Sequence, residues 1–184
     1  MNTLSATLVR WTIEDYHTMI DASLFINRHV ELLNGLVVEM PPEGPDHADL
    51  STDTLEFFMA AANNRYRVRP AKPITIPANN SEPEPDIALV KPQSYRQSHP
   101  TPDDVFLIVE FSNTSLAKDT ADKRRAYASA GIQDYWVVNL RDRQLIVYRN
   151  PSNDDYTSEQ RLKAGSISPL AFPDITLTVR TLLD

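Results

Sequence analysis

The segment that most constrains the fold is residues 105–140, in which two short apolar runs flank a helical pattern. The first run begins at Val105 and ends in an acid, Glu110, and the second extends from Tyr135 to Val138. Short apolar runs bounded by turn residues are typical of buried strands. The segment therefore predicts a strand, a helix and a second strand. A carboxylate at the end of a buried strand is costly unless it is paired or coordinated, so Glu110 is the first indication of a site.

The intervening helix carries Asp119, Lys123 and Tyr127 at intervals of four residues. This spacing places the three side chains along one face of the helix. One interpretation is a solvated ion pair covered by a tyrosine. The other is that Lys123 points back over the strand end toward Glu110 and serves a metal–carboxylate site. The helix by itself does not decide between the two.

Asp86 opens a second predicted strand, Pro85 to Val90, which is followed by a polar, proline-rich loop. If this strand pairs antiparallel with the strand that ends in Glu110, Val90 falls near Phe106 and Asp86 lies opposite Glu110. Directly opposed residues share a face of a sheet. Two neighbouring carboxylates repel each other unless a cation lies between them, and oxygen ligands suit Mg²⁺ or Mn²⁺.

Together these residues resemble the PD-(D/E)xK nuclease superfamily, most closely its Uma-two family of restriction endonuclease-like proteins. The resemblance rests on Asp86 after a proline, Glu110 after an apolar strand and Lys123 on the next helix. Other matching positions are Ser112, Asp119, Tyr127, Gly131, Tyr135 and Trp136. The superfamily's usual lysine two residues after the acid is Ser112 here, so Lys123 would take its role. The departures are Ser115, Asp134 and Asn139, and none of them removes a proposed metal ligand.

The resemblance continues upstream. Asn34-Gly35 between two apolar runs is a strong hairpin signal, and Glu31 lies on the first arm. Glu31 is either an exposed strand acid or, by the resemblance, a further ligand for metal or water. His47 matches a family histidine at the start of a helix. It is either a surface residue or a group that acts near the scissile phosphate or orients Glu31.

The resemblance implies an α+β fold with a restriction-endonuclease-like core, in which helices flank a mixed sheet. It also implies a Mg²⁺-dependent endonuclease that hydrolyses phosphodiester bonds, with Mn²⁺ as a substitute and DNA favoured over RNA. The implied catalytic residues are Asp86, Glu110, Lys123, Glu31 and His47. Of these, Asp86, Glu110 and Glu31 would bind the metal, and Lys123 would assist the attacking water or stabilise the oxyanion. Cutting both strands of a duplex would favour a homodimer.

The charge of the chain opposes tight binding of nucleic acid, because 25 acidic residues outnumber 18 basic ones and the net charge is −7. The best basic feature is the alternation of Arg65, Arg67 and Arg69, which predicts one basic face of an extended segment. It is either a strip that contacts phosphates or a solvated, charged sheet edge. Two rivals to the nuclease hypothesis stay open: a catalytically silent relative that binds or regulates, and a purely structural role for the ion pairs.

With 184 residues, the chain is expected to form a single domain over residues 1–184. It has no apolar run of membrane-spanning length, no signal-peptide pattern at its start and no cysteine, so we expect a cytoplasmic protein without membrane contact. Further expected helices cover residues 12–22 (with Thr12 as cap) and 46–63 (with Asp46 as cap). Further expected strands cover residues 74–76, 144–149, 156–162, 167–171 and 175–179, and residues 181–184 are expected to fray.

Overall fold

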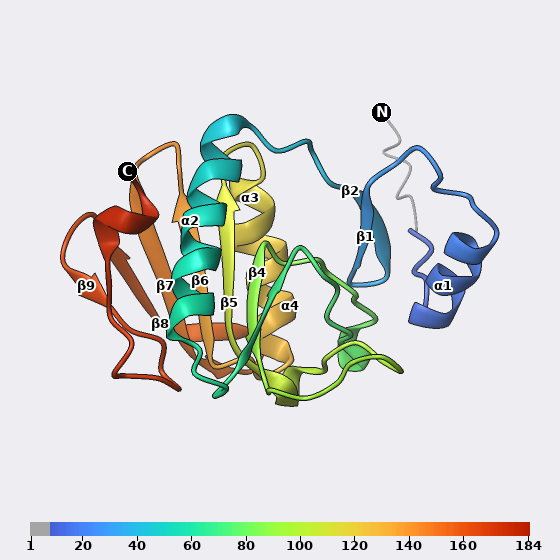
Figure 1. The fold of residues 1–184 in the computed structure, drawn as a ribbon. Helices are drawn as coiled ribbons and strands as arrows, with labels where there is room; N and C mark the ends of the chain where they lie inside the picture. The colour runs from blue at the N-terminus through green and yellow to red at the C-terminus, as the bar shows by residue number, and fades with distance from the viewer. Residues whose placement is uncertain (1–7) are drawn as a thin grey trace.

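Six strands form one mixed sheet in the computed structural model, which describes residues 8–184 (Figure 1). Its strand order is β3-β4-β5-β6-β7-β8, and only β5 and β6 run parallel. The strands are β3 (Arg67–Pro70), β4 (Ile87–Val90), β5 (Val105–Ser112), β6 (Asp134–Asn139), β7 (Gln144–Ser152) and β8 (Asp155–Leu162). The expected mixed sheet flanked by helices is confirmed.

The parallel pair β5 and β6 is joined by a helical crossover, as a parallel connection requires. The crossover consists of α3 (Leu116–Lys118), the π-helical segment η3 (Asp119–Lys123) and α4 (Arg124–Ser129). The predicted order of strand, helix and strand is therefore confirmed, whereas the π-helical turn was not expected. Such turns are rare and are frequently found at functional sites.

The two faces of the sheet have separate cores because side chains alternate along each strand. On one face, Val109 packs in a cluster with Phe58 of α2 (Pro45–Ala61) and with the C-terminal segment. On the other face, Ile108 packs with Tyr127 of α4. Glu110 follows the alternation of Ile108, so its side chain lies on the α4 side, where the crossover covers it.

The N-terminal part consists of α1 (Ile13–Asp21) and a hairpin of β1 (Val30–Leu33) and β2 (Leu36–Glu39), beside the main sheet (Figure 1). Thr12 caps α1 as predicted. The predicted hairpin is also confirmed, with Asn34 and Gly35 at φ 51° and 75°. The backbone of Glu82 donates to the carbonyl of Leu32 at 2.8 Å, and this contact docks the hairpin beside the entrance to β4.

The register of β4 on β5 agrees with the expectation at Ala88, which pairs with Ile108. It differs at the other end of the strand, because an irregularity after Leu89 pairs Val90 with Val105 and not with Phe106. This irregularity lies at the end of β4 remote from Asp86. Asp86 therefore still lies opposite Glu110, as predicted.

Other boundaries differ from the expectations. α2 begins at Pro45 after Gly44, so Asp46 lies in the first turn and is not the cap. Residues 74–76 form no strand, and Ile76 makes only an isolated bridge to Ser81. In place of the strands expected at 167–171 and 175–179, the structure has the two-residue strands β9 (Ser166–Ile167) and β10 (Leu177–Thr178), which pair with each other. The short helices η1, η2 and η4 cover Pro77–Asn79, Pro102–Asp104 and Val179–Leu182.

The C-terminus does not fray, contrary to the expectation from its position. Leu182 and Leu183 are buried in the cluster that includes Phe58 of α2, because η4 turns these side chains into the core. No helix within residues 8–184 is both long and apolar enough to cross a membrane. The expectation that the chain starts without a signal peptide rests partly on residues 1–7, which lie outside the described part.

Candidate functional site

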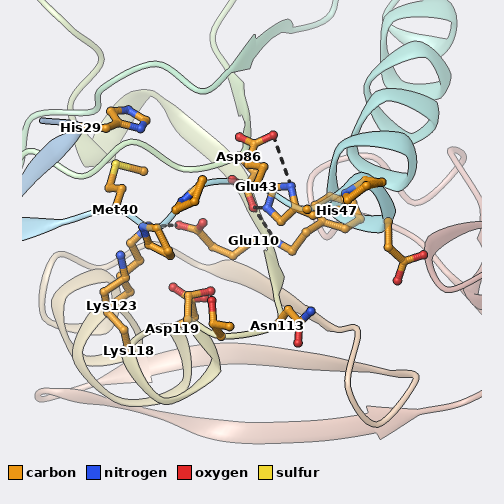
Figure 2. A pocket seen from close by; sticks show the side chains of 18 residues that line it. His29, Met40, Glu43, His47, Asp86, Glu110, Asn113, Lys118, Asp119 and Lys123 are labelled. Atoms are coloured by element: carbon orange, nitrogen blue, oxygen red, sulfur yellow. Dashed lines mark hydrogen bonds and ion pairs between the residues drawn. The ribbon is translucent and has the colours of Figure 1, made fainter. Parts of the chain in front are cut away.

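A cleft of about 470 Å³ opens where β5 ends beside the start of α2 (Figure 2). One wall is formed by the connection from β2 to α2, which includes Glu43, and by the first turn of α2, which includes His47. The opposite wall is the crossover after β5, including Lys118 and Lys123. Asp86 and Glu110 lie between these walls, and both line the cleft.

Lys123 points back over the end of β5 at Glu110. Its Nζ lies 2.8 Å from Oε1 of Glu110, and the Tyr127 hydroxyl donates to the same oxygen at 3.0 Å. Lys123 and Glu110 are 2% and 3% exposed, and Asp119 is 2% exposed, which excludes a solvated ion pair of Asp119 with Lys123. Tyr127 therefore orients Glu110 directly.

Glu31 is completely buried, so the interpretation as an exposed strand acid is wrong. Its Oε1 lies 2.7 Å from Nζ of Lys118, and its Oε2 lies 3.2 Å from Nζ of Lys123. The same Oε2 accepts from the backbone N–H of Glu84 at 3.2 Å. Burial opposes ionisation of Glu31, but the charges of Lys123 and Lys118 outweigh burial and lower the pKa of Glu31 below its usual range. Glu31 lies behind the lysines and is not part of the cleft lining.

The π-helical turn explains how Lys118 and Lys123 reach the same carboxylate. Residues five apart diverge on a regular α-helix, whereas a turn with an i→i+5 hydrogen bond brings them closer to one face. Sequence reasoning with a period of four residues paired Lys123 with Asp119 and missed Lys118. The spacing of five between the two lysines was the available signal.

Asp119 is held away from Lys123 by other partners. The Ser112 hydroxyl donates to its Oδ2 at 2.6 Å, and the Tyr135 hydroxyl donates to its backbone carbonyl at 2.9 Å. Ser112 and Asp119 are both buried. These contacts tie the start of the π-helical segment to β5 and β6, which places Lys123 over Glu110.

Asp86 precedes β4 at the level of Glu110, since Ile87 pairs with Val109. Its Oδ2 accepts from the backbone N–H of Phe111 at 2.6 Å. The same oxygen lies 3.0 Å from Nε2 of His47. Within residues 8–184, no hydrogen bond engages Oδ1 of Asp86 or Oε2 of Glu110. One oxygen of each acid is therefore free to bind a ligand.

His47 lies in the first turn of α2 and contacts Asp86, not Glu31. Its Nδ1 lies 3.5 Å from Oε2 of Glu43, a residue that sequence reasoning missed although it stands four positions before His47. Burial disfavours the charged imidazole, but the hydrogen bond and charge of Asp86, together with Glu43, raise the pKa of His47.

Glu110 sits among like charges. Burial is the main reason why its pKa is raised, and the charges of Asp86, Asp119 and Glu31 add to the effect, while Lys123 opposes it. Burial would lower the pKa of Lys123, yet Glu110, Glu31 and Asp119 raise it above its usual value. A divalent cation at the free carboxylate oxygens would relieve this repulsion, and carboxylate oxygens are the donors that such ions prefer. The residues present therefore fit a divalent metal.

The three predicted arginines do not share a face. Arg65 precedes β3, pairs with Asp174 at 2.7 Å and stacks on Phe172. Arg67 and Arg69 alternate on β3, an edge strand, and the guanidinium of Arg69 stacks on Tyr95. Two of the three arginines thus remain as a basic edge, whose end lies beside Asp86 because Ala71 N–H donates to the Asp86 carbonyl at 3.0 Å.

The comparisons with known proteins agree with this geometry. The model of a family named Uma2, described as "Putative restriction endonuclease", matches residues 13–180. No curated protein matches the chain. Five chains of solved structures match, among them a "putative nuclease belonging to DUF820" from Anabaena variabilis. That structure superposes with a TM-score of 0.71 over 93% of this chain and 96% of the other, at 13% identity. At this identity the likeness concerns the fold.

Proposed function

Since the chain belongs to the Uma2 family, whose description is "Putative restriction endonuclease", we propose that it is a metal-dependent endonuclease acting on nucleic acid. DNA is the favoured substrate. The observation that carries the proposal is the buried Lys123, held at 2.8 Å from Glu110 beside Asp86 and open to the cleft. A buried lysine among carboxylates at a cleft is the type of group that enzymes use to handle a proton or a developing negative charge.

Asp86 and Glu110 are the proposed ligands of Mg²⁺, with Mn²⁺ as a substitute. Each acid has one oxygen engaged by the protein, which orients the carboxylate, and one oxygen that faces no protein donor within the described part of the chain. When bound, the metal would acidify a coordinated water and neutralise charge that develops at phosphorus.

Lys123 is the proposed partner of the attacking water or of the phosphorane oxygens. Its Nζ is held between Oε1 of Glu110 and Oε2 of Glu31, so little reorganisation is needed during the reaction. Both oxygens of Glu31 are engaged by Lys118, Lys123 and a backbone N–H. These contacts favour a role for Glu31 in positioning the lysines over its expected role as a metal ligand.

The substrate is proposed to approach along the basic edge, since Arg67 and Arg69 lead along β3 toward Asp86. The remaining surface is acidic overall, with a net charge of −7, so binding should depend on metal and on this edge. Cleavage of both strands of a duplex would need two copies of the site, which favours a homodimer on the substrate. The absence of cysteine fits action in the reducing cytoplasm.

The test is cleavage of supercoiled plasmid and of single strands in Mg²⁺ and then Mn²⁺. Wild type is compared with Asp86→Asn and Glu110→Gln, and Glu39→Gln serves as the control because Glu39 is an exposed acid on β2. Activity in wild type and control, and in neither site variant, would support the proposal. Cleavage that persists in both site variants would contradict it. Metal binding without cleavage of any substrate would favour the silent relative, which the acidic charge also favours.

A further inference from the structure

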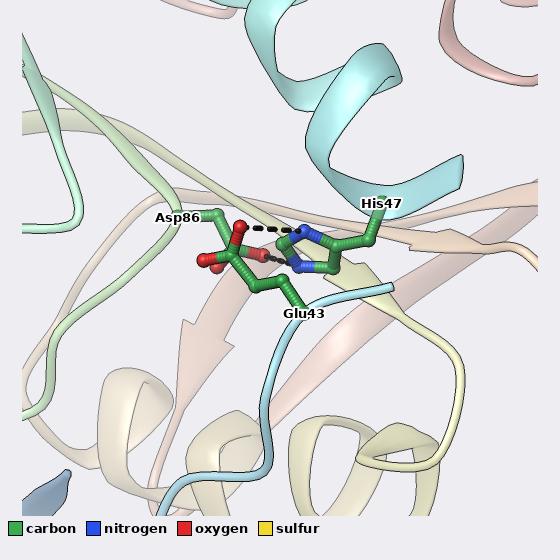
Figure 3. Close-up of side chains that lie close together, drawn as sticks. All are labelled: Glu43, His47 and Asp86. Carbon is green, nitrogen blue, oxygen red and sulfur yellow. Dashed lines mark hydrogen bonds and ion pairs between the residues drawn. The ribbon is translucent and has the colours of Figure 1, made fainter. Parts of the chain in front are cut away.

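A second group of potential ligands adjoins the proposed metal position on the side away from Lys123. Glu43, His47 and Asp86 each offer one ligand atom, and these atoms lie within 4.8 Å of one another (Figure 3). Glu43 comes from the connection before α2, His47 from the first turn of α2 and Asp86 from the entrance to β4. Figure 3 shows both carboxylates along the nitrogen-bearing side of the imidazole.

We propose that Glu43, His47 and Asp86 form a separate site for a divalent transition-metal ion, which shares Asp86 with the Asp86–Glu110 position. The inference rests on the proposed function in that both use Asp86. It adds a second ion with a different ligand chemistry, because one of its ligands is a nitrogen.

The spacing of the ligand atoms suits an ion. Two ligand atoms about 2.1 Å from one ion lie about 3.0 Å apart when they are at right angles. Nε2 of His47 and Oδ2 of Asp86 are 3.0 Å apart. A cation about 2.1 Å from both atoms would lie beside the line that joins them and would replace the shared proton, with the imidazole turning to direct Nε2 at the ion. The Glu43 side chain is 51% exposed and is free to close on the ion from the mouth of the cleft.

The charge around this group is uncompensated. Glu31 and Glu110 are paired with lysines, whereas neither Glu43 nor Asp86 contacts a lysine or an arginine within residues 8–184. Only the imidazole of His47 lies between them. Two carboxylates that face each other across one histidine, in a partly buried cleft, form a site of negative potential that favours a cation.

The environment of His47 is an independent observation. Its Nδ1 is buried and has no hydrogen-bond partner in the described chain, which is unusual for a buried polar atom. The ring packs edge-on against Phe111, with the centroids 5.8 Å apart. Such packing restricts rotation of the ring, so it limits the directions in which Nε2 can point. Nδ1 of His47 lies 3.5 Å from Oε2 of Glu43, and Glu43 would turn from Nδ1 toward the ion once Nε2 binds it.

The nitrogen ligand determines which ions this site prefers. Imidazole suits transition metals such as Zn²⁺ and Mn²⁺, whereas Mg²⁺ prefers oxygen ligands. Mg²⁺ should therefore compete well at Asp86–Glu110 and poorly at the site with His47. Zn²⁺ should bind the His47 site more tightly than Mn²⁺ does.

The experiment is calorimetric titration of the full chain with Mn²⁺, repeated in excess Mg²⁺. We expect two Mn²⁺ ions per wild-type chain and one in the presence of Mg²⁺. His47→Gln and Glu43→Gln should each weaken one of the two ions by more than about tenfold. The matched controls are His29→Gln, since His29 lines the same cleft, and Glu39→Gln; both should keep two ions. Circular dichroism verifies that each variant is folded.

Glu110→Gln separates this inference from the proposed function. A single ion in wild type that is lost in Glu110→Gln and kept in His47→Gln would overturn the inference and leave the proposed function intact. A single ion lost in His47→Gln and kept in Glu110→Gln would support the inference and contradict the proposed ligand role of Glu110. Absence of Mn²⁺ binding in wild type would overturn both.

Discussion

Lys123 and Glu110 are separated by 13 residues in the sequence and by 2.8 Å in the structure, and both are almost fully buried. Removing two charges from water is expensive, and their attraction compensates this cost only when the geometry is good. Here a hydroxyl from Tyr127 and a second carboxylate, Glu31, complete the arrangement. The stability of the crossover is thus coupled to the same residues that we propose for catalysis.

Replacing the lysine tests this coupling. Lys123→Met should abolish cleavage and should lower the free energy of unfolding by about 3–5 kcal/mol, because Glu110 and Glu31 are left buried without their partner. Mn²⁺ binding should be largely retained, since Lys123 is not a proposed ligand. Urea denaturation, calorimetry and plasmid cleavage measure the three quantities. Loss of Mn²⁺ binding by a folded variant would contradict the assigned role.

The role of Arg67 and Arg69 in substrate binding is tested by the salt dependence of DNA binding. Arg67→Gln with Arg69→Gln should weaken DNA binding in a Lys123→Met background, in which we expect no cleavage but retained metal binding. The slope of log Kobs against log salt should fall by about 0.9 for each phosphate contact that is lost. Arg180→Gln is the control for loss of an exposed arginine elsewhere on the surface, because the Arg180 side chain is 81% exposed and pairs with Asp184. Equal binding by the double variant and the control would exclude the basic edge as the substrate surface.

The hairpin that carries Glu31 depends on Gly35. Its φ is +75°, and a Cβ there would lie 2.9 Å from Cβ of Arg10 and 3.1 Å from the Trp11 carbonyl oxygen. Gly35→Ala should therefore lower the free energy of unfolding by more than about 1 kcal/mol. Gly44→Ala is the control, since a Cβ at Gly44 meets nothing within 4 Å. The free energies of unfolding of both variants are measured by urea denaturation. Equal losses in the two variants would contradict the expectation that a side chain at position 35 strains the turn.

Tyr66 should make the free energy of unfolding depend on pH in the alkaline range. Burial raises the pKa of Tyr66 from 10.0 to about 12, and its hydroxyl donates to the Phe58 carbonyl at 2.8 Å. The unfolded chain releases this proton first, so the contribution of Tyr66 is complete below pH 10 and is lost as the pH rises through about 12. Tyr66→Phe should show a shallower fall of unfolding free energy between these values, measured by urea denaturation. If the free energy of unfolding fell equally with pH in the variant and in wild type, the raised pKa of Tyr66 would be contradicted.

Local patterns in the sequence were sufficient for the elements that position the two acids. The apolar runs before Glu110 and after Asp86 predicted adjacent strands, and antiparallel pairing across the loop between them predicted that Asp86 lies opposite Glu110. Asn34-Gly35 predicted the hairpin since both residues adopt positive φ readily. Lys123 entered the expected site as one of two interpretations of the helix after Glu110, and Glu31 entered through the resemblance. The structure places Nζ of Lys123 within 3.2 Å of both acids.

The expectations failed where the partner of a side chain lies far away in the chain. Arg65 was expected beside Arg67, but it pairs with Asp174, 109 residues later. Leu182 and Leu183 looked like a frayed end, yet they fill space beneath α2. No short-range pattern encodes such contacts, because their free energy depends on which surface another element leaves uncovered.

The sequence by itself determined the two strands that position Asp86 and Glu110 and the hairpin that carries Glu31, since these depend on apolar runs and turn chemistry within short segments. Only the tertiary structure decided which charges pair. The π-helical turn brought Lys118 and Lys123 to Glu31, and the start of α2 brought His47 and Glu43 to Asp86. The reason is physical: a charge is stabilised by the groups that surround it after burial, and those groups come from separate parts of the chain.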